Sequence, residues 1–223
     1  FRAIESYVIR RMATKLQTRG YGPVFVEVLK AARDAGGHPG HAAIEALRAH
    51  SQVWPDQNSV LESFRDSRYY GPGGINQERL RLILGEIDKL MQKRSTKTEP
   101  AVFDYARLQI EHVIPQDWRQ KWPVDEPDAA TREVGEIERD RHINRIGNLT
   151  LVKGNLNASI SNHPWATKRA GLAEHSKLAL NAQIIENDYW DETRITIRGA
   201  SLAREFDEIW PGPESTIWDK SKS

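Results

Sequence analysis

Two apolar segments separated by residues 116–145 constrain the fold of this chain more than any other feature. The first, residues 108–115, reads LQIEHVIP and predicts a short strand that carries a carboxylate beside an imidazole. The second, residues 146–152, reads IGNLTLV and predicts another strand that is opened by a Gly-Asn pair. A short helix with an Asn at its start is expected from about Asn155. The chain is therefore predicted to contain a strand–strand–helix unit.

Three polar side chains of this unit are of types that suit phosphodiester hydrolysis. That reaction needs a base to activate water and a divalent cation to carry charge on the phosphate and the leaving oxygen. His112 supplies a base near neutral pH. The oxygen atoms of Glu111 and Asn157 suit Mg²⁺, which keeps several of its waters. Neighbours on a regular strand face opposite ways, so Glu111 and His112 share a site only at a strand end or a bulge, and Pro115 favours an early strand end.

The order His, Asn, Asn on strand, strand and helix resembles the one-metal HNH (ββα-metal) nucleases. Residues 101–211 further resemble the nuclease half of the GmrSD-type restriction family, whose enzymes attack modified foreign DNA, and residues 1–30 resemble the segment that precedes it. Proteins of the SspE type, which act in phosphorothioation-linked phage defence, share this layout. The matching residues are Ile110 to Pro115, Trp118, Arg145 to Val152, Asn157, Ser161, Asn162, Lys168, Trp190 and Ile209 to Pro211.

The resemblance implies a role for each polar residue. His112 is expected to be the general base, and Asn148 to orient the His112 ring or to pin the hairpin. Glu111 and Asn157 are expected to bind the cation, with Asn155 as the alternative if the helix register differs by two. The cation is expected to be Mg²⁺, with Mn²⁺ as the alternative. No zinc is expected, because the chain has no Cys for the four-Cys site that braces many HNH relatives.

The distribution of charge, rather than the net charge of +1, points to DNA. Residues 139–177 hold seven Lys or Arg against two acids, whereas residues 123–138 hold six acids against one Arg. The basic stretch coincides with the predicted nuclease core, as a phosphate-binding surface would. Arg145, Lys168 and Arg169 are expected to contact the sugar-phosphate backbone of DNA, with little sequence specificity.

Hydrophobic periodicity predicts helices over most of the remaining chain. We expect a mostly α protein with a small ββα-metal (HNH) nuclease core, in which a helical N-terminal part and C-terminal helices pack around a β-hairpin. The predicted boundaries are 1–100 for a helical region that belongs to an absent N-terminal domain, 101–178 for the nuclease core, 179–213 for C-terminal helices and 214–223 for a frayed tail.

The leading hypothesis is a metal-dependent HNH endonuclease or nickase that hydrolyses DNA as part of a bacterial anti-phage restriction protein. Two alternatives remain open: a catalytically inactive DNA-binding module and a helical protein-interaction domain. The resemblance also implies an N-terminal nucleotide-hydrolysing or modification-sensing domain as a partner. No apolar run is long enough to span a bilayer, so no membrane partner and a cytoplasmic location are expected.

Overall fold

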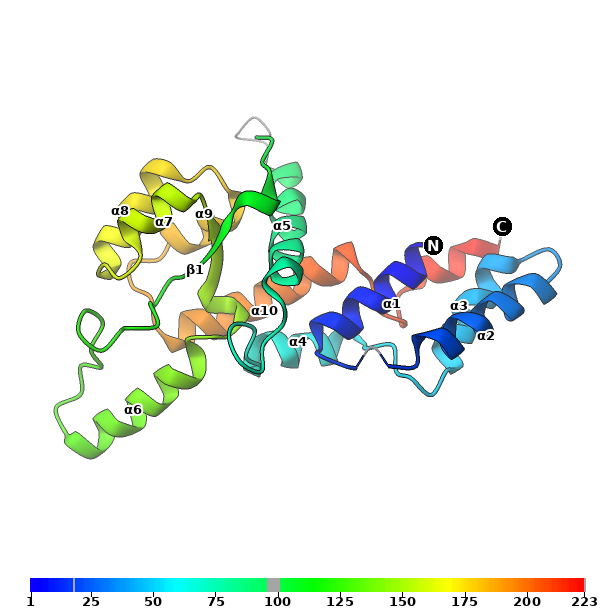
Figure 1. Cartoon of the computed structure of the whole chain (residues 1–223), viewed down its shortest axis with the longest axis horizontal. Helices are drawn as coiled ribbons and strands as arrows, with labels where there is room; N and C mark the ends of the chain where they lie inside the picture. Colours follow the sequence, from blue (N-terminus) through cyan, green and yellow to red (C-terminus); the bar gives the residue numbers. More distant parts are fainter. Residues whose placement is uncertain (18, 96–100, 223) are drawn as a thin grey trace. The chain divides into compact units, whose positions relative to one another are not determined.

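A computed structural model describes residues 1–17, 19–95 and 101–222 of the chain (Figure 1). These residues are mostly helical with one small antiparallel sheet, as the sequence predicts. The α-helices are α1 (Arg2–Ala13), α2 (Tyr21–Asp34), α3 (Pro39–Ala49), α4 (Gln57–Asp66), α5 (Gln77–Arg94), α6 (Ala129–His142), α7 (Gly154–Ile160), α8 (Trp165–His175), α9 (Ala179–Ile185) and α10 (Glu192–Ile209). The strands are β1 (Gln109–His112) and β2 (Leu149–Val152), and the 3₁₀ helices are η1 (Tyr105–Arg107), η2 (Ile146–Asn148) and η3 (Thr216–Lys222).

The chain divides into two compact units, and the division differs from the predicted domain boundaries. Unit 1 consists of Phe1–Ser63 and Phe206–Ser223, and unit 2 consists of Phe64–Glu205. The predicted boundary at residue 100 falls on residues 96–100, which lie outside the described residues. Helix α5, expected to belong to a separate N-terminal region, is part of the same unit as the hairpin.

Unit 1 is a helical unit with an aromatic core. Tyr7 of α1 is fully buried, and the guanidinium carbon of Arg11 lies 5.4 Å from the centre of its ring. The segment after Pro213 was expected to be a frayed tail, but it forms η3 and buries Trp218 against Trp54, with ring centres 5.6 Å apart. The polar composition of this segment suggested disorder, but burial of the Trp218 ring holds the segment in place.

Unit 2 is built around the β-hairpin. Strands β1 and β2 pair antiparallel, with Ile110 opposite Leu151 and His112 opposite Leu149. Both predicted strands and the start of the following helix α7 are confirmed. Every residue of β2 is buried, so that strand has no solvent-exposed face. The core beside the hairpin is apolar and aromatic, and its buried members include Val113, Ile114, Trp118, Val152, Leu156, Leu172 and Trp190.

Helix α5 is fastened within unit 2 by one buried carboxylate. The side chain of Asp88 accepts hydrogen bonds from the backbone N–H of Leu180 at 2.8 Å and from the hydroxyl of Tyr105 at 2.6 Å. Burial and these contacts with Asp88 raise the pKa of the Tyr105 phenol. The carboxylate therefore joins α5 to α9 and to η1, which leads directly into β1.

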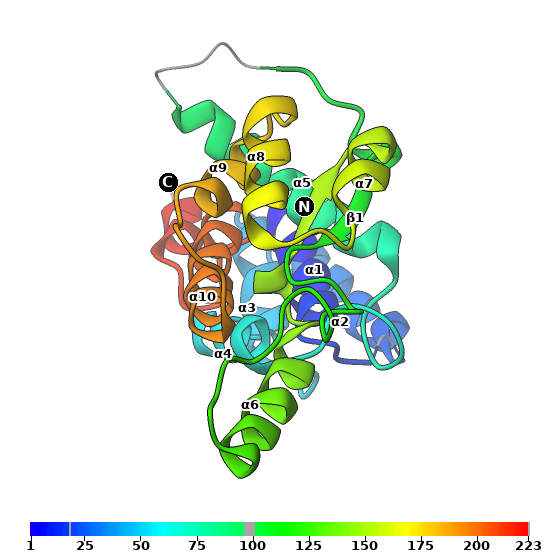
Figure 2. The ribbon, with the colours of Figure 1, turned by 90° about the vertical axis from the view of Figure 1, so that its left-hand side faces the viewer.

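The N-terminal part of helix α6 stands apart from the other elements of unit 2 in both views (Figures 1 and 2), whereas its last turns reach α10 through an ion pair between Arg139 and Glu192 at 2.6 Å. The only buried residue of α6 is His142, at the C-terminal end, where the chain returns toward the hairpin. The side chain of Asp128 caps its first turn by accepting from Thr131 N–H at 2.8 Å. Across the described part of the chain, no helix has the length and apolar character needed to cross a bilayer.

Candidate active site

A cleft of about 220 Å³ opens beside the end of β1 and gathers three of the predicted site residues. Glu111 and His112 reach it from β1, and Asn157 reaches it from α7. The complete lining consists of Tyr70, Ile110, Glu111, His112, Pro115, Gln116, Asn157, Ser161 and Asn162.

The end of the strand explains how two adjacent residues line one cleft. Strand β1 ends at His112, as the sequence argument required if Glu111 and His112 were to share a site. After His112 the chain no longer follows the ladder, although Val113 N–H still donates to the carbonyl of Asn148 at 2.9 Å. The cleft therefore extends around the last two residues of the strand.

The imidazole of His112 is held on two sides. Its Nε2 lies 3.0 Å from Oδ1 of Asn144, and its ring meets the ring of Tyr70 edge to face, with centres 4.7 Å apart. Burial, with a contribution from the nearby charge of Lys168, lowers the pKa of His112 to about 4. The ring is therefore neutral near pH 7, which is the state that a general base requires.

Glu111 forms a buried ion pair with Lys168 of α8. The Nζ atom of Lys168 donates to Oε1 of Glu111 at 2.5 Å and to the backbone carbonyl of His112 at 2.5 Å. Burial raises the pKa of Glu111 and lowers that of Lys168, while their mutual attraction opposes both shifts. The pair holds one carboxylate oxygen and the end of β1 in a fixed arrangement.

Asn157 has one satisfied and one unsatisfied side-chain atom. Its Nδ2 donates to Oε1 of Gln109 at 2.9 Å, whereas its Oδ1 is buried and has no hydrogen-bond partner. Buried polar atoms without partners are uncommon, and one at a cleft is a candidate ligand atom. Asn155, the alternative considered for a different register, does not line the cleft, and its Oδ1 accepts from the N–H of Leu156.

The donor atoms of the cleft fit a hard divalent cation. The described residues contain no group of three or more His, Cys, Asp and Glu placed to hold a metal ion. Glu111 and Asn157 line the same cleft, and Oδ1 of Asn157 is buried without a hydrogen-bond partner. One carboxylate with an amide oxygen is the kind of sparse protein ligand set with which Mg²⁺ retains several waters.

Asn148 serves the hairpin rather than the His112 ring. Its Oδ1 accepts from Ile114 N–H at 2.9 Å and from the indole of Trp190 at 3.2 Å. Its Nδ2 donates to the carbonyls of Ile114 and Ile143, both at 2.9 Å. Of the two roles expected for Asn148, the described contacts match pinning of the hairpin, and the His112 ring is held by Asn144 instead.

Helix α10 packs closely on the same turn. A Cβ atom at Gly147 would collide with the carbonyl oxygen of Ile195, so only glycine permits this approach. Arg198, which is buried, donates to the carbonyls of Gly147 and Leu149, each at 2.8 Å. Together these contacts hold the start of β2 against α10.

The three basic residues expected at a DNA-binding surface lie in different settings. Lys168 is not on the surface: it is 1% exposed and committed to Glu111, so the expectation that it lies on a phosphate-contacting surface is wrong for this structure. Arg145 is largely enclosed and contacts His142 at 2.6 Å. Arg169 is 38% exposed in its side chain and donates to the carbonyl of Ile185. Of the three, Arg169 is the most accessible to a phosphate.

Sequence reasoning missed two residues around His112. Tyr70 lies in a loop far upstream of the motif, and nothing in its local sequence relates it to the site. Asn144 lies directly after α6, where an Asn is ordinarily a turn former. Ser161 and Asn162, which were taken to match the family without an assigned role, both line the cleft.

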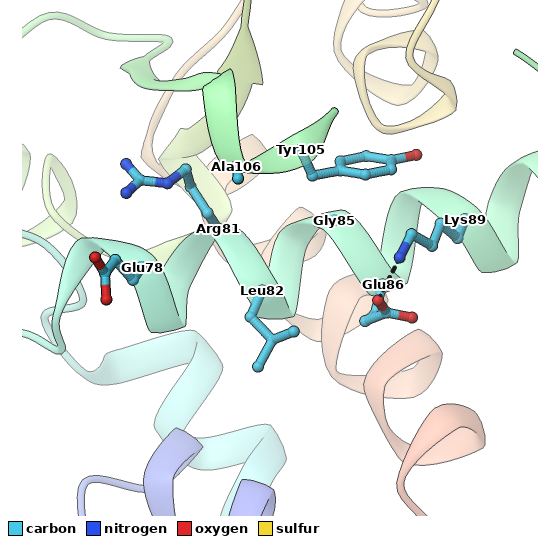
Figure 3. Close-up of a pocket in the computed structure, with 8 residues that line it drawn as sticks. All are labelled: Glu78, Arg81, Leu82, Gly85, Glu86, Lys89, Tyr105 and Ala106. Carbon is cyan, nitrogen blue, oxygen red and sulfur yellow. Dashed lines mark hydrogen bonds and ion pairs between the residues drawn. The ribbon is translucent and has the colours of Figure 1, made fainter. Parts of the chain in front are cut away.

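A second hollow of unit 2, on one face of α5, lacks the features of a reaction site (Figure 3). It has about 370 Å³ of space and shares no lining residue with the His112 cleft. Lys89 in its wall is paired with Glu86 at 2.6 Å, and the ring of Tyr105 lies over Gly85. The lining of this hollow contains no histidine and none of the predicted site residues.

Comparison with known protein families gives one match. The family of GmrSD restriction endonucleases, C-terminal domain, matches residues 54–205. The match contains the whole cleft and includes α4 and α5, so it begins well before the predicted boundary at residue 101. No curated protein matches the chain.

Proposed function

The chain belongs to the C-terminal domain family of the GmrSD restriction endonucleases, and we propose that its His112 cleft hydrolyses a phosphodiester bond of DNA in an HNH-type reaction. One observation carries this proposal: Glu111, His112 and Asn157 come from β1 and α7 to line a single cleft. A neutral imidazole and oxygen-bearing side chains thus line one cleft, in a chain that belongs to a family of nucleases, and this combination supports the proposal.

His112 is the proposed general base. Because Oδ1 of Asn144 accepts a hydrogen bond from Nε2 of the ring, Nε2 carries the hydrogen and Nδ1 keeps a lone pair. Nδ1 can take the proton of a water molecule that attacks phosphorus, and the water oxygen then forms the new bond while the bond to the leaving oxygen of the sugar breaks.

Glu111 and Asn157 are the proposed ligands of a divalent cation, Mg²⁺ first and Mn²⁺ as the alternative. When bound, such a cation neutralises charge that develops on the phosphate and the leaving oxygen. Lys168 engages Oε1 of Glu111, so Oε2 is the carboxylate oxygen that stays outside this ion pair. We assign Lys168 the task of fixing the Glu111 carboxylate and the end of β1, in place of a contact with DNA.

The proposed substrate is DNA, which the name of the matched family supports. Activity within an anti-phage system, a preceding nucleotide-hydrolysing or modification-sensing domain, a link to phosphorothioation and a cytoplasmic location are further expectations from the resemblance. Contacts with the DNA backbone are assigned to exposed basic residues such as Arg169.

The experiment is an incubation of the purified chain with supercoiled plasmid in Mg²⁺, in Mn²⁺ and in EDTA. The proposal expects open-circular or linear product with either metal and none with EDTA. Equal cleavage in EDTA would contradict the metal requirement. Salt-sensitive binding to the plasmid with no cleavage under any condition would favour an inactive DNA-binding module. Absence of both binding and cleavage would favour a protein-interaction domain.

A further inference from the structure

We propose that Asn144 is the positioning residue of the site: its side chain fixes the His112 imidazole as the Nε2–H tautomer and thereby makes Nδ1 the atom that accepts the proton. The catalytic consequence of this tautomer rests on the proposed function. The tautomer itself is a property of the protein without DNA or metal.

The hydrogen bond between the two side chains carries the argument. Oδ1 of Asn144 lies 3.0 Å from Nε2 of His112, and both residues are only 7% exposed. An amide oxygen accepts and cannot donate, so the ring nitrogen that faces it must carry a hydrogen. Water has little access to replace this acceptor at such burial, so loss of the amide oxygen would leave a buried N–H unsatisfied.

The backbone of Asn144 anchors the loop that carries Tyr70, whose ring contacts the imidazole. Its carbonyl accepts from the N–H of Tyr69 at 2.7 Å and from that of Tyr70 at 3.4 Å. Tyr70 places its ring edge to face against His112, at an interplanar angle of 84°. The side chain of Asn144 therefore fixes the imidazole directly. Its backbone anchors the loop of Tyr70, and the Tyr70 ring limits rotation of the imidazole.

The other asparagines near the hairpin cannot perform this task. Both side-chain atoms of Asn148 are committed to Ile114, Ile143 and Trp190. The Oδ1 atom of Asn157 has no hydrogen-bond partner among the described residues, so it does not accept from the His112 ring. Of these three asparagines, Asn144 is the one whose side chain contacts the His112 ring.

The experiment records long-range ¹H–¹⁵N spectra of the His112 ring in the full chain near neutral pH, without DNA and in EDTA. Three variants accompany the wild type. Asn144→Leu removes the acceptor at similar volume, and Asn144→Asp keeps an oxygen in its place. Asn58→Leu makes the matched change at an exposed asparagine of α4.

We expect the Nε2–H tautomer in the wild type, in Asn144→Asp and in Asn58→Leu, and a mixture of tautomers in Asn144→Leu. Plasmid cleavage should fall on the order of 10- to 100-fold in Asn144→Leu, as for other residues that orient a catalytic group, and should recover in Asn144→Asp. A wild-type ring in the Nδ1–H tautomer would overturn the inference, even if Asn144→Leu did not fold. So would a folded Asn144→Leu that kept both the Nε2–H tautomer and full cleavage.

The two proposals fail in different ways. If the wild type cleaves no DNA while its ring shows the Nε2–H tautomer and Asn144→Leu loses it, the proposed function fails and the positioning by Asn144 stands. If the wild type cleaves DNA with the Nδ1–H tautomer, the reverse holds.

Discussion

Two asparagines of the motif, nine positions apart in the sequence, have opposite environments. Asn148, on the turn side of the hairpin, is fully buried and uses both side-chain atoms in hydrogen bonds to Ile114, Ile143 and Trp190. Asn157, on the cleft side, leaves its Oδ1 without a partner. The same residue type thus stabilises the fold in one region and presents a free ligand atom in the other.

The difference shows how structural and functional polar groups can be separated in this protein. A buried amide whose hydrogen-bonding capacity is filled has nothing left to offer a substrate or a cation. A buried oxygen that is left unfilled costs free energy, and a binding role accounts for that cost. Under this interpretation, substitutions on the turn side should lower stability and those on the cleft side should lower activity.

The largest effect on stability is expected from Asn148→Ala. The change leaves the backbone groups of Ile114, the carbonyl of Ile143 and the indole of Trp190 without their partner. Each buried group left unsatisfied costs about 1–3 kcal/mol, so the free energy of unfolding should fall by about 3 kcal/mol or more. Urea denaturation followed by circular dichroism measures this loss. A loss below about 1 kcal/mol would mean that the hairpin does not depend on Asn148.

Gly147→Ala should give the next largest loss of stability. The added methyl group would collide with the carbonyl oxygen of Ile195 in α10. That oxygen belongs to the backbone, so it cannot move aside as the end of a flexible side chain could. Overpacking of this kind typically costs about 1–3 kcal/mol. Gly37→Ala is the matched control, because a Cβ atom there meets nothing within 4 Å. Equal melting temperatures for the two variants would refute the close approach of α10 to the turn.

Asn157→Ala should have a small effect on stability and a clear effect on metal dependence. The variant loses one exposed hydrogen bond to Gln109 and also removes an unsatisfied oxygen, so the free energy of unfolding should change by less than about 1 kcal/mol. Titration of plasmid cleavage with Mg²⁺ or Mn²⁺ should require more metal or show no activity. Asn155→Ala provides the control, and an unchanged metal midpoint in Asn157→Ala would exclude that residue as a ligand.

A further prediction concerns the protonation of His112 in the metal-free protein. Its pKa in the fold is about 4, against about 6.5 for an exposed histidine. Between these values the unfolded chain binds a proton that the folded chain does not, so His112 contributes stability that is present above about 6.5 and lost as the pH falls toward 4. Burial is the main cause of the lowered pKa of His112; the hydrogen bond with Asn144 opposes the shift, and the charge of Lys168 adds to it.

An NMR titration of the His112 ring in EDTA measures this directly, with the urea-unfolded chain as the control. The ring should stay neutral through the range in which the unfolded chain titrates. A midpoint near 6.5 in the folded protein would show that the imidazole is more solvated than the structure implies.

The hairpin and the α7 helix could be predicted from sequence because local patterns determine them. The Gly-Asn pair before β2 and the early end of β1 at His112 are both properties of short segments. The sparse oxygen ligand set was likewise expected from residue types and stays a prediction. What could not be predicted depends on contacts between distant segments.

Three residues illustrate those distant contacts. Tyr70 reaches His112 from a loop that precedes β1 by almost forty residues, and no periodicity encodes that approach. Lys168 appeared to be a surface cation, but burial beside Glu111 was decided by the packing of α8 on the end of β1. Asn144 looked like a turn residue because its side-chain partner lies 32 positions away.

The most direct test of the account compares plasmid cleavage by His112→Ala and by His175→Ala with that of the wild type in saturating Mg²⁺. His175 is an exposed histidine outside the cleft and serves as the matched control. Circular dichroism confirms the fold of each variant. Loss of the general base should lower the cleavage rate by roughly 10²–10⁴-fold in His112→Ala, while His175→Ala should cleave as the wild type does. A folded His112→Ala protein that cleaves at the wild-type rate would contradict the assignment of the cleft as the active site.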